Sequence, residues 1–196
     1  MKLFEKIILD ADICIKLSGL ERVSDAFYRV ISQITEKAYI DQYINEEEVL
    51  TKRNQLERLI SEKIVEVLNP DTILNDVTMK DVYTQTKRNL YKEFVGEEEP
   101  KVKRGKNFGE VHSLAIAKAL RIPVFMSDEG QLQPIVNRLL NTGLDDITVF
   151  RLKNIILWMK ENPECGFNIQ EAKAIFFGTT DRKYLESHKV WFKENW

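Results

Sequence analysis

Short apolar runs alternate with longer stretches of helical periodicity along this chain. Residues 7–9 and 124–126 are continuous apolar runs, and an acidic residue follows each within two positions. Runs of this length are typical of buried strands in a parallel sheet, whereas apolar residues spaced three and four apart indicate helices. Helical spacing covers residues 23–34, 78–94 and 110–120. The alternation predicts an α/β domain, a three-layer α/β/α sandwich with a central, mainly parallel sheet.

The stretch between residues 37 and 70 is interpreted as a strand followed by a long helix. Residues 37–44 alternate or run apolar and predict a second strand. Asn45 is followed three positions later by Glu48, an arrangement typical of a capping box. A long helix is therefore expected from there through Val67, where Asn-Pro at the following positions, ending in Pro70, stops it.

Acidic residues stand where a parallel sheet can bring them together. Asp10 follows the first apolar run, and Asp12 lies two positions later. Asp128 follows the later run, and Glu110 lies at the start of the helix that precedes that run. Because ligands of open α/β sheets bind at the carboxyl ends of the strands, these acids are expected to meet at one edge.

Together these features resemble PIN-domain ribonucleases. The features are an apolar strand ending in Asp, a helix that opens with Gly-Glu at Gly109, a strand ending in Ser-Asp, and a closing strand, helix, Gly turn and short helix. The resemblance covers residues 4–177. It implies a PIN-like nuclease domain over residues 1–178, followed by an aromatic and basic helix or tail over residues 179–196. It also implies RNA as substrate, and it is compatible with a protein partner such as an antitoxin and with a homodimer.

The second acid of the resembled site falls in a run of three glutamates. In that family a Glu lies in the first turn or two of the helix after the second strand, and Glu46, Glu47 and Glu48 all qualify. Counting from Ile44 selects Glu47, whereas pairing the acid with Val49 selects Glu48; Glu47 is preferred. Each of the three would also stabilise a helix simply by lying near its positive N-terminus.

The chemistry that crowded carboxylates support is metal binding. Such groups repel one another unless a cation neutralises them, and hard oxygen ligands select Mg²⁺ or Mn²⁺. The resemblance implies Asp10, Glu110 and Asp128 as metal ligands, with Glu47 completing the catalytic set by holding a second ion, a water or a proton. The acids expected to support these ligands are Asp12, Glu48 and Glu129.

Two basic segments are candidates for RNA contact. The net charge is −2, so any RNA-binding surface must be a local patch. Lys103, Arg104 and Lys106 precede the Glu110 helix and are expected to hold RNA phosphates. Residues 182–196 interleave Lys with aromatic residues, a pattern that fits either base stacking or the docking face of a terminal helix.

Two other functions remain open. Asp10 and Asp12 also satisfy the Asp-x-Asp pattern of haloacid-dehalogenase-type phosphatases, although Ile-Cys follows where such enzymes usually have Gly-Thr. The other alternative is a catalytically degenerate PIN-like module that only binds partners. The first residues lack the apolar core of a signal peptide, and no segment approaches the roughly 18 apolar residues that span a membrane, so a cytoplasmic location and no membrane partner are expected.

Overall fold

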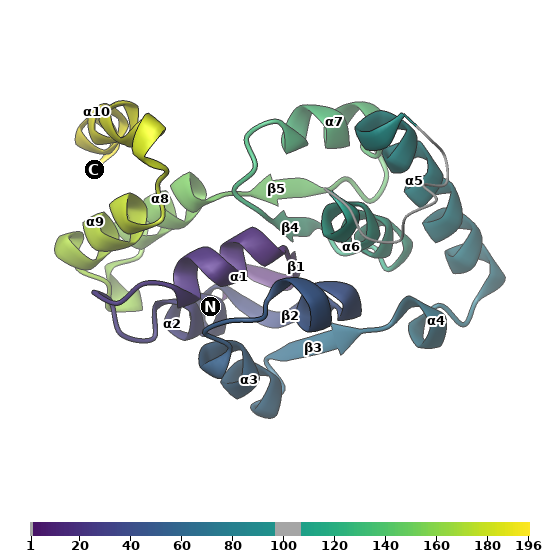
Figure 1. Ribbon diagram of the computed structural model, residues 1–196, viewed down its shortest axis with the longest axis horizontal. Coiled ribbons are helices and arrows are strands. Elements are labelled where there is room, and N and C mark those ends of the chain that lie inside the picture. Colours follow the sequence, from purple (N-terminus) through teal and green to yellow (C-terminus); the bar gives the residue numbers. More distant parts are fainter. Residues whose placement is uncertain (1, 97–106) are drawn as a thin grey trace.

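A five-stranded, entirely parallel sheet forms the centre of the described chain. The computed structural model describes residues 2–96 and 107–196 (Figure 1). The strands lie in the order β3-β2-β1-β4-β5, so β1 is central. Ile8 of β1 is paired with Tyr39 on one side and with Phe125 on the other. The strands are β1 (Phe4–Leu9), β2 (Thr35–Asp41), β3 (Val65–Leu68), β4 (Val124–Met126) and β5 (Thr148–Phe150).

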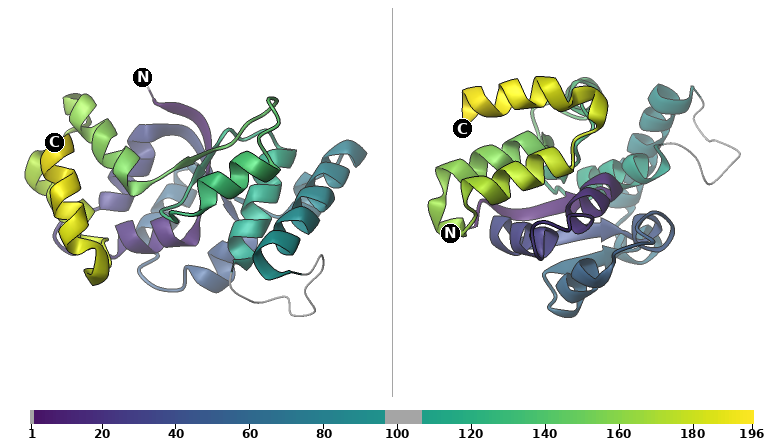
Figure 2. Two further views of the ribbon diagram at one scale, coloured as in Figure 1. Left: turned by 90° about the horizontal axis from the view of Figure 1, so that it is seen from above. Right: turned by 60° about the vertical axis from the view of Figure 1, so that its left-hand side comes forward.

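Helices cover both faces of the sheet. Side chains alternate between the two faces along each strand, so the apolar residues of one strand are buried on both faces. Ile7 and Leu9 belong to one core cluster, and Ile8 belongs to the other. The sheet lies between these two helical layers (Figures 1 and 2). One layer contains α1 (Ala11–Ser18), α2 (Ala26–Ile34), α3 (Asn54–Ser61), α8 (Leu152–Glu161) and α9 (Ile169–Gly178). The other contains α5 (Val77–Val95), α6 (Phe108–Ala119) and α7 (Leu132–Leu139).

The strand order reverses between β1 and β4. The chain runs outward from β1 through β2 to β3, then returns to the opposite side of β1 with β4. Directly after the two strands, the Asp10 amide donates to the Met126 carbonyl over 3.0 Å. Such a reversal opens a crevice at the carboxyl ends of the two strands, the usual ligand site of open α/β sheets.

The long helix expected from Asn45 through Val67 is wrong. A five-residue π-helix, η1 (Ile44–Glu48), and helix α3 take the place of its first part, and Val67 lies in β3. Lys63 adopts a left-handed backbone (φ 60°) between α3 and β3. Apolar and polar residues alternate from Val65 to Val67, a pattern that fits a strand at the edge of the sheet. Pairing with β2 therefore overrides the local helix preference. A short helix, α4 (Pro70–Ile73), follows.

The C-terminal segment packs on the domain as a helix. It contains η3 (Arg182–Tyr184) and α10 (Leu185–Asn195), and it follows the short turn η2 (Pro163–Cys165) and α9 along the chain. Phe192 of α10 is buried, and Trp191 and Trp196 pack against the same core cluster. Figure 2 shows α10 lying across the layer formed by α8 and α9.

The predicted α/β class and parallel sheet are confirmed, since all four strand pairings are parallel. The predicted phosphate-binding residues Lys103, Arg104 and Lys106 lie outside the described residues. No helix in the described parts of the chain is both long and apolar enough to cross a membrane.

Candidate functional site

A pocket of about 500 Å³ opens at the carboxyl ends of β1 and β4. Five of the acids singled out in the sequence line it: Asp10, Asp12, Glu110, Asp128 and Glu129. The rest of its lining comes from Lys16, Gly130, Arg151 and the C-terminal residues Thr179, Thr180, Asp181, Lys183, Tyr184 and His188. The sheet therefore brings the predicted acids to one place.

Asp10 is the buried acid at the base of this pocket. It caps α1, with its carboxylate accepting from the Ala11 amide over 2.8 Å. Burial raises the pKa of Asp10 well above its usual range, and the charges of Asp12 and Glu110 raise it further. Hydrogen bonds from Ser127 and Ala11 oppose the shift. Because the net shift is upward, the negative charge at Asp10 is not fully compensated by the protein.

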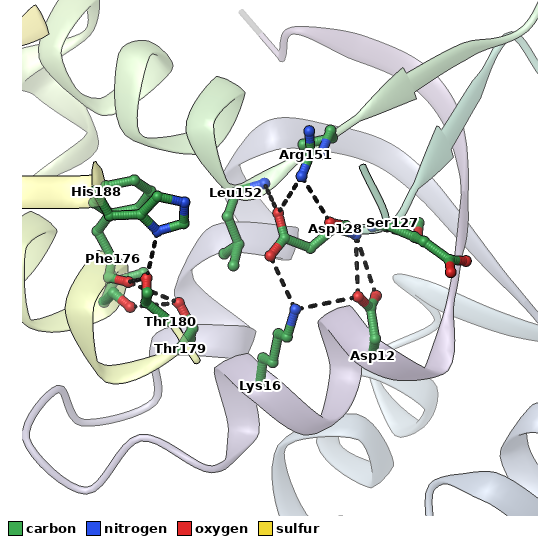
Figure 3. A network of polar contacts seen from close by, with 12 residues as sticks. Asp12, Lys16, Ser127, Asp128, Arg151, Leu152, Phe176, Thr179, Thr180 and His188 are labelled. Carbon is green, nitrogen blue, oxygen red and sulfur yellow. Dashed lines mark hydrogen bonds and ion pairs between the residues drawn. The ribbon is translucent and has the colours of Figure 1, made fainter. Parts of the chain in front are cut away.

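Asp128 is held by cations and by a helix N-terminus. Lys16 Nζ lies 2.9 Å from its Oδ2, and Arg151 Nη2 lies 3.8 Å from its Oδ1. The Leu152 amide, at the start of α8, also donates to Oδ1 over 3.3 Å. Figure 3 shows Asp128 between these three groups. Unlike Asp10, Asp128 has its charge balanced by neighbouring side chains.

Asp12 links α1 to the loop after β4. Its carboxylate accepts from the Asp128 amide at 3.2 and 3.3 Å, and Lys16 Nζ lies 3.4 Å away (Figure 3). Burial lowers the pKa of Lys16, but the hydrogen bond to Asp128 and the charges of Asp12 and Asp128 outweigh it, and the net shift is upward. Lys16 is thus a permanent cation between two carboxylates, one helical turn after Asp12.

Glu48, rather than Glu47, lies against the Glu110 helix. The Gly109 amide donates to the Glu48 carboxylate. A Cβ placed on Gly109 would come within 2.7 Å of Glu48 Oε2 and 2.9 Å of Ile44 Cγ1. Ile44 and Glu48 lie four positions apart on one side of η1, so both can face α6. Burial raises the pKa of Glu48 to about 7, and the charges of Glu110 and Asp41 contribute.

The preference for Glu47 therefore does not match the geometry. Its side chain is exposed, whereas Glu48 is half-buried. The residue that points to the correct acid is the apolar Ile44. On η1, Glu48 four positions later lies on the same side as Ile44, whereas Glu47 three positions later does not. The charge of Glu110 contributes to the raised pKa of both Asp10 and Glu48, so Glu110 links these two acids electrostatically.

The donor chemistry fits a hard divalent cation at Asp10 and Glu110, where negative charge accumulates. It does not fit such an ion at Asp128 in the present arrangement, because Lys16 and Arg151 occupy that carboxylate. Consistent with this, no group of three or more His, Cys, Asp or Glu side chains within residues 2–96 and 107–196 is placed to hold a metal ion. The three acids line one pocket without forming a preassembled three-carboxylate site.

Sequence reasoning missed the cationic side of the pocket. Lys16 could have been found from its i+4 spacing to Asp12, a usual ion-pair spacing on a helix. Arg151 follows β5 directly, at the same sheet edge as the acids, and donates to the Asp128 carbonyl over 2.9 Å. Residues 182–196 were a candidate for RNA contact, but their sequence does not show that Lys183, Tyr184 and His188 line the same pocket as the acids.

No family model, curated protein or solved structure matches this chain in the three comparisons made. The function must therefore be inferred from the geometry of the pocket.

Proposed function

We propose that this protein is a Mg²⁺- or Mn²⁺-dependent nuclease that cleaves RNA at the pocket between β1 and β4. The observation that supports this most strongly is that buried Asp10 lines one pocket with Asp12 and Glu110; burial first, and then the charges of these two acids, raise the pKa of Asp10 well above its usual range. Carboxylates held together against their own repulsion are a frequent property of functional sites that take a cation. The PIN-like resemblance gives the same reaction class.

The proposal assigns different roles to the acids. Asp10 and Glu110 would hold the ion. When bound, the ion would polarise the scissile phosphate and activate a water. Glu48, with a pKa raised to about 7, is suited to accept or donate a proton near neutral pH. Asp128 with Lys16 forms an ion pair at the rim of the pocket. Arg151, which also contacts Asp128, lines the same pocket, where a phosphate oxygen can approach.

The phosphatase alternative has less support. It requires Asp12 to act as a proton donor and acceptor beside Asp10. In the structure the Asp12 carboxylate accepts from the Asp128 amide and lies beside Lys16, so its oxygens are already engaged. A degenerate module that binds RNA without cleaving it would have the same pocket, and it is an outcome of the test below.

The direct test is cleavage of a fluorescently labelled single-stranded RNA in Mn²⁺ and in EDTA. Asp10→Asn and Glu110→Gln remove the expected metal ligands, and Glu48→Gln removes the expected acid-base group; each is expected to lower the rate by at least about 100-fold. Glu47→Gln is the matched control, since it removes the same charge from an exposed neighbour on η1. Cleavage that persists in EDTA, or that Glu47→Gln lowers as much as Glu48→Gln, would refute the proposal.

A further inference from the structure

Cations as well as acids line the pocket. Arg151 precedes α8 and Lys183 belongs to η3, and the acids Asp128 and Asp181 line the pocket with them. Lys183 makes no ion pair within the described chain and lies with its Nζ 4.7 Å from the centre of the Tyr184 ring. Arg151 Nε is buried and has no hydrogen-bond partner among the described residues. Arg151 Nη2 is engaged with Asp128, so Lys183 is the one of these two cations that the described fold leaves without an ion pair.

An aromatic stack stands beside these cations. The Phe176 and His188 rings are nearly parallel, with centres 4.8 Å apart and an angle of 16° between planes. Tyr184 continues the stack, 6.2 Å from His188 at 24°. Thr180 Oγ1 lies 2.8 Å from His188 Nδ1 and fixes that ring, as Figure 3 shows for Phe176, Thr180 and His188. Tyr184, the outermost ring, is 51% exposed although it lines the pocket.

The two ends of the aromatic C-terminal segment have different surroundings. Phe192 is buried, and Trp191 and Trp196 pack against the core, so this part docks α10. Lys183 and Tyr184 instead face the pocket, although a helix-docking role alone would not require a half-exposed ring there. The docking of α10 therefore accounts for the tryptophans but does not explain why Lys183 and Tyr184 line the pocket.

We infer that η3 and Arg151 bind one nucleotide of a single-stranded RNA, with its phosphate between Arg151 and Lys183 and its base stacked on Tyr184. The inference rests on the proposed function, because it places this nucleotide next to the acids at which the RNA is cleaved. A cation beside an exposed aromatic ring matches the two recurring parts of a single-stranded nucleotide, its phosphate and its base. His188 is a positioning residue that holds Tyr184 from behind.

Binding in EDTA separates this subsite from the cleavage chemistry. The probe is a short 5′-fluorescein-labelled single-stranded RNA, and binding is followed by fluorescence anisotropy. Tyr184→Ala is expected to raise Kd by about 10-fold, which is typical of losing one stacked base, and Tyr184→Phe should bind like wild type. Lys183→Ala should weaken binding and lower the slope of log Kd against log salt by about one phosphate contact. Lys189→Ala, an exposed lysine of α10 outside this pocket, is the matched control.

Three results would overturn the inference. Wild-type protein that binds no RNA would do so, as would binding that is unaffected by Tyr184→Ala and Lys183→Ala. Equal weakening by Lys189→Ala would show general attraction to basic residues instead of a subsite. Thermal melts of each variant establish that it is folded, and for an unfolded Tyr184→Ala the pair Tyr184→Leu and Tyr184→Phe replaces it.

The two proposals fail in distinguishable ways. Wild-type protein that binds RNA through Tyr184 and Lys183 but never cleaves it in Mn²⁺ would retain the nucleotide subsite and refute the nuclease. Mn²⁺-dependent cleavage with an unchanged KM in Tyr184→Ala and Lys183→Ala would retain the nuclease and refute the subsite. Asp10→Asn is expected to bind RNA in EDTA at least as well as wild type, because the change removes negative charge from the pocket.

Discussion

Lys16 Nζ lies 2.9 Å from Asp128 Oδ2, although the two residues are 112 positions apart. The pair joins α1, which begins just after β1, to the loop that follows β4, and so links the ends of the two strands with a salt bridge. Both side chains are largely shielded from solvent, with 30% and 15% of their surfaces exposed. A cation supplied by the protein thus stands at one of the acids expected to bind a metal.

Removing this cation should lower the stability of the protein and raise its affinity for a metal ion. Lys16→Met leaves Asp128 without its nearest cation and is expected to cost about 1–3 kcal/mol of unfolding free energy in EDTA. It should also lower the Mn²⁺ concentration that gives half-maximal stabilisation, because Lys16 no longer competes for the carboxylate. Denaturant unfolding with and without Mn²⁺ measures both effects. Lys189→Met, which removes an exposed lysine paired with Glu186, is the control and should change neither quantity.

Asp10 and Asp128 should respond in opposite ways to neutralisation. In EDTA at pH 8, Asp10→Asn is expected to raise the free energy of unfolding, since burial and the charges of Asp12 and Glu110 disfavour its ionised form. Asp128→Asn should lower unfolding free energy by about 1–3 kcal/mol, because it breaks the pair with Lys16. Asp10→Asn should also reduce the stabilisation given by Mn²⁺, which for wild type is about 2.7 kcal/mol at 100 times Kd. An Asp10→Asn protein that melts lower in EDTA, yet gains as much from Mn²⁺, would assign Asp10 to helix capping alone.

Gly109 should tolerate no side chain. Gly109→Ala places a Cβ 2.7 Å from Glu48 Oε2 and 2.9 Å from Ile44 Cγ1, so one of these groups must move. The expected cost is about 1–3 kcal/mol, typical of overpacking, together with a loss of any activity that depends on Glu48. Urea unfolding measures the cost, and the double variant Gly109→Ala/Glu48→Ala should recover part of it. The matched control is Gly130→Ala, whose added Cβ would meet only Arg151 at 3.5 Å or more. Equal costs for the two single variants would contradict the close packing of Glu48.

His112 should make the protein less stable in acid. Its ring nitrogens lie 3.0 Å from the Tyr83 hydroxyl and 2.9 Å from the Tyr91 hydroxyl, and burial, helped by the charge of Lys87, lowers its pKa to about 4. The unfolded chain takes up the proton near pH 6.5, so this contribution to stability is complete above that pH and is lost as pH falls towards 4. The loss is expected to be roughly 2 kcal/mol at pH 5.

The comparison that isolates this effect is wild type against His112→Gln, by urea unfolding from pH 4.5 to 8. Burial raises the pKa of nearby Asp41 to about 6, and this acts in the opposite direction, because its contribution is lost as pH rises through 6. Asp41 is present in both proteins, so the difference between them belongs to His112. Parallel pH profiles for the two proteins would show that His112 is not neutral and buried in the folded state.

The strands β1 and β4, and the acids that follow them, could be predicted from short windows of the sequence. The apolar runs before Asp10 and Asp128 lie within windows of a few residues, and short continuous apolar runs are typical of strands in a parallel sheet. The helix that starts at Glu110 follows from local periodicity in the same way. The shared edge of Asp10, Glu110 and Asp128 was predictable from these elements alone.

The groups that surround those acids depend on how the elements pack and could not be predicted from the sequence. The strand at Val65 forms because β2 has an edge to pair, and Glu48 replaces Glu47 because η1 turns Ile44 and position i+4 towards Gly109. The salt bridge from Lys16 to Asp128 joins residues far apart in the chain, and the pocket brings Tyr184 close to acids that are also distant in the sequence. Local patterns carry no information about such partners, because they are selected by the packing of elements whose spacing in the sequence is unrelated to their distance in space.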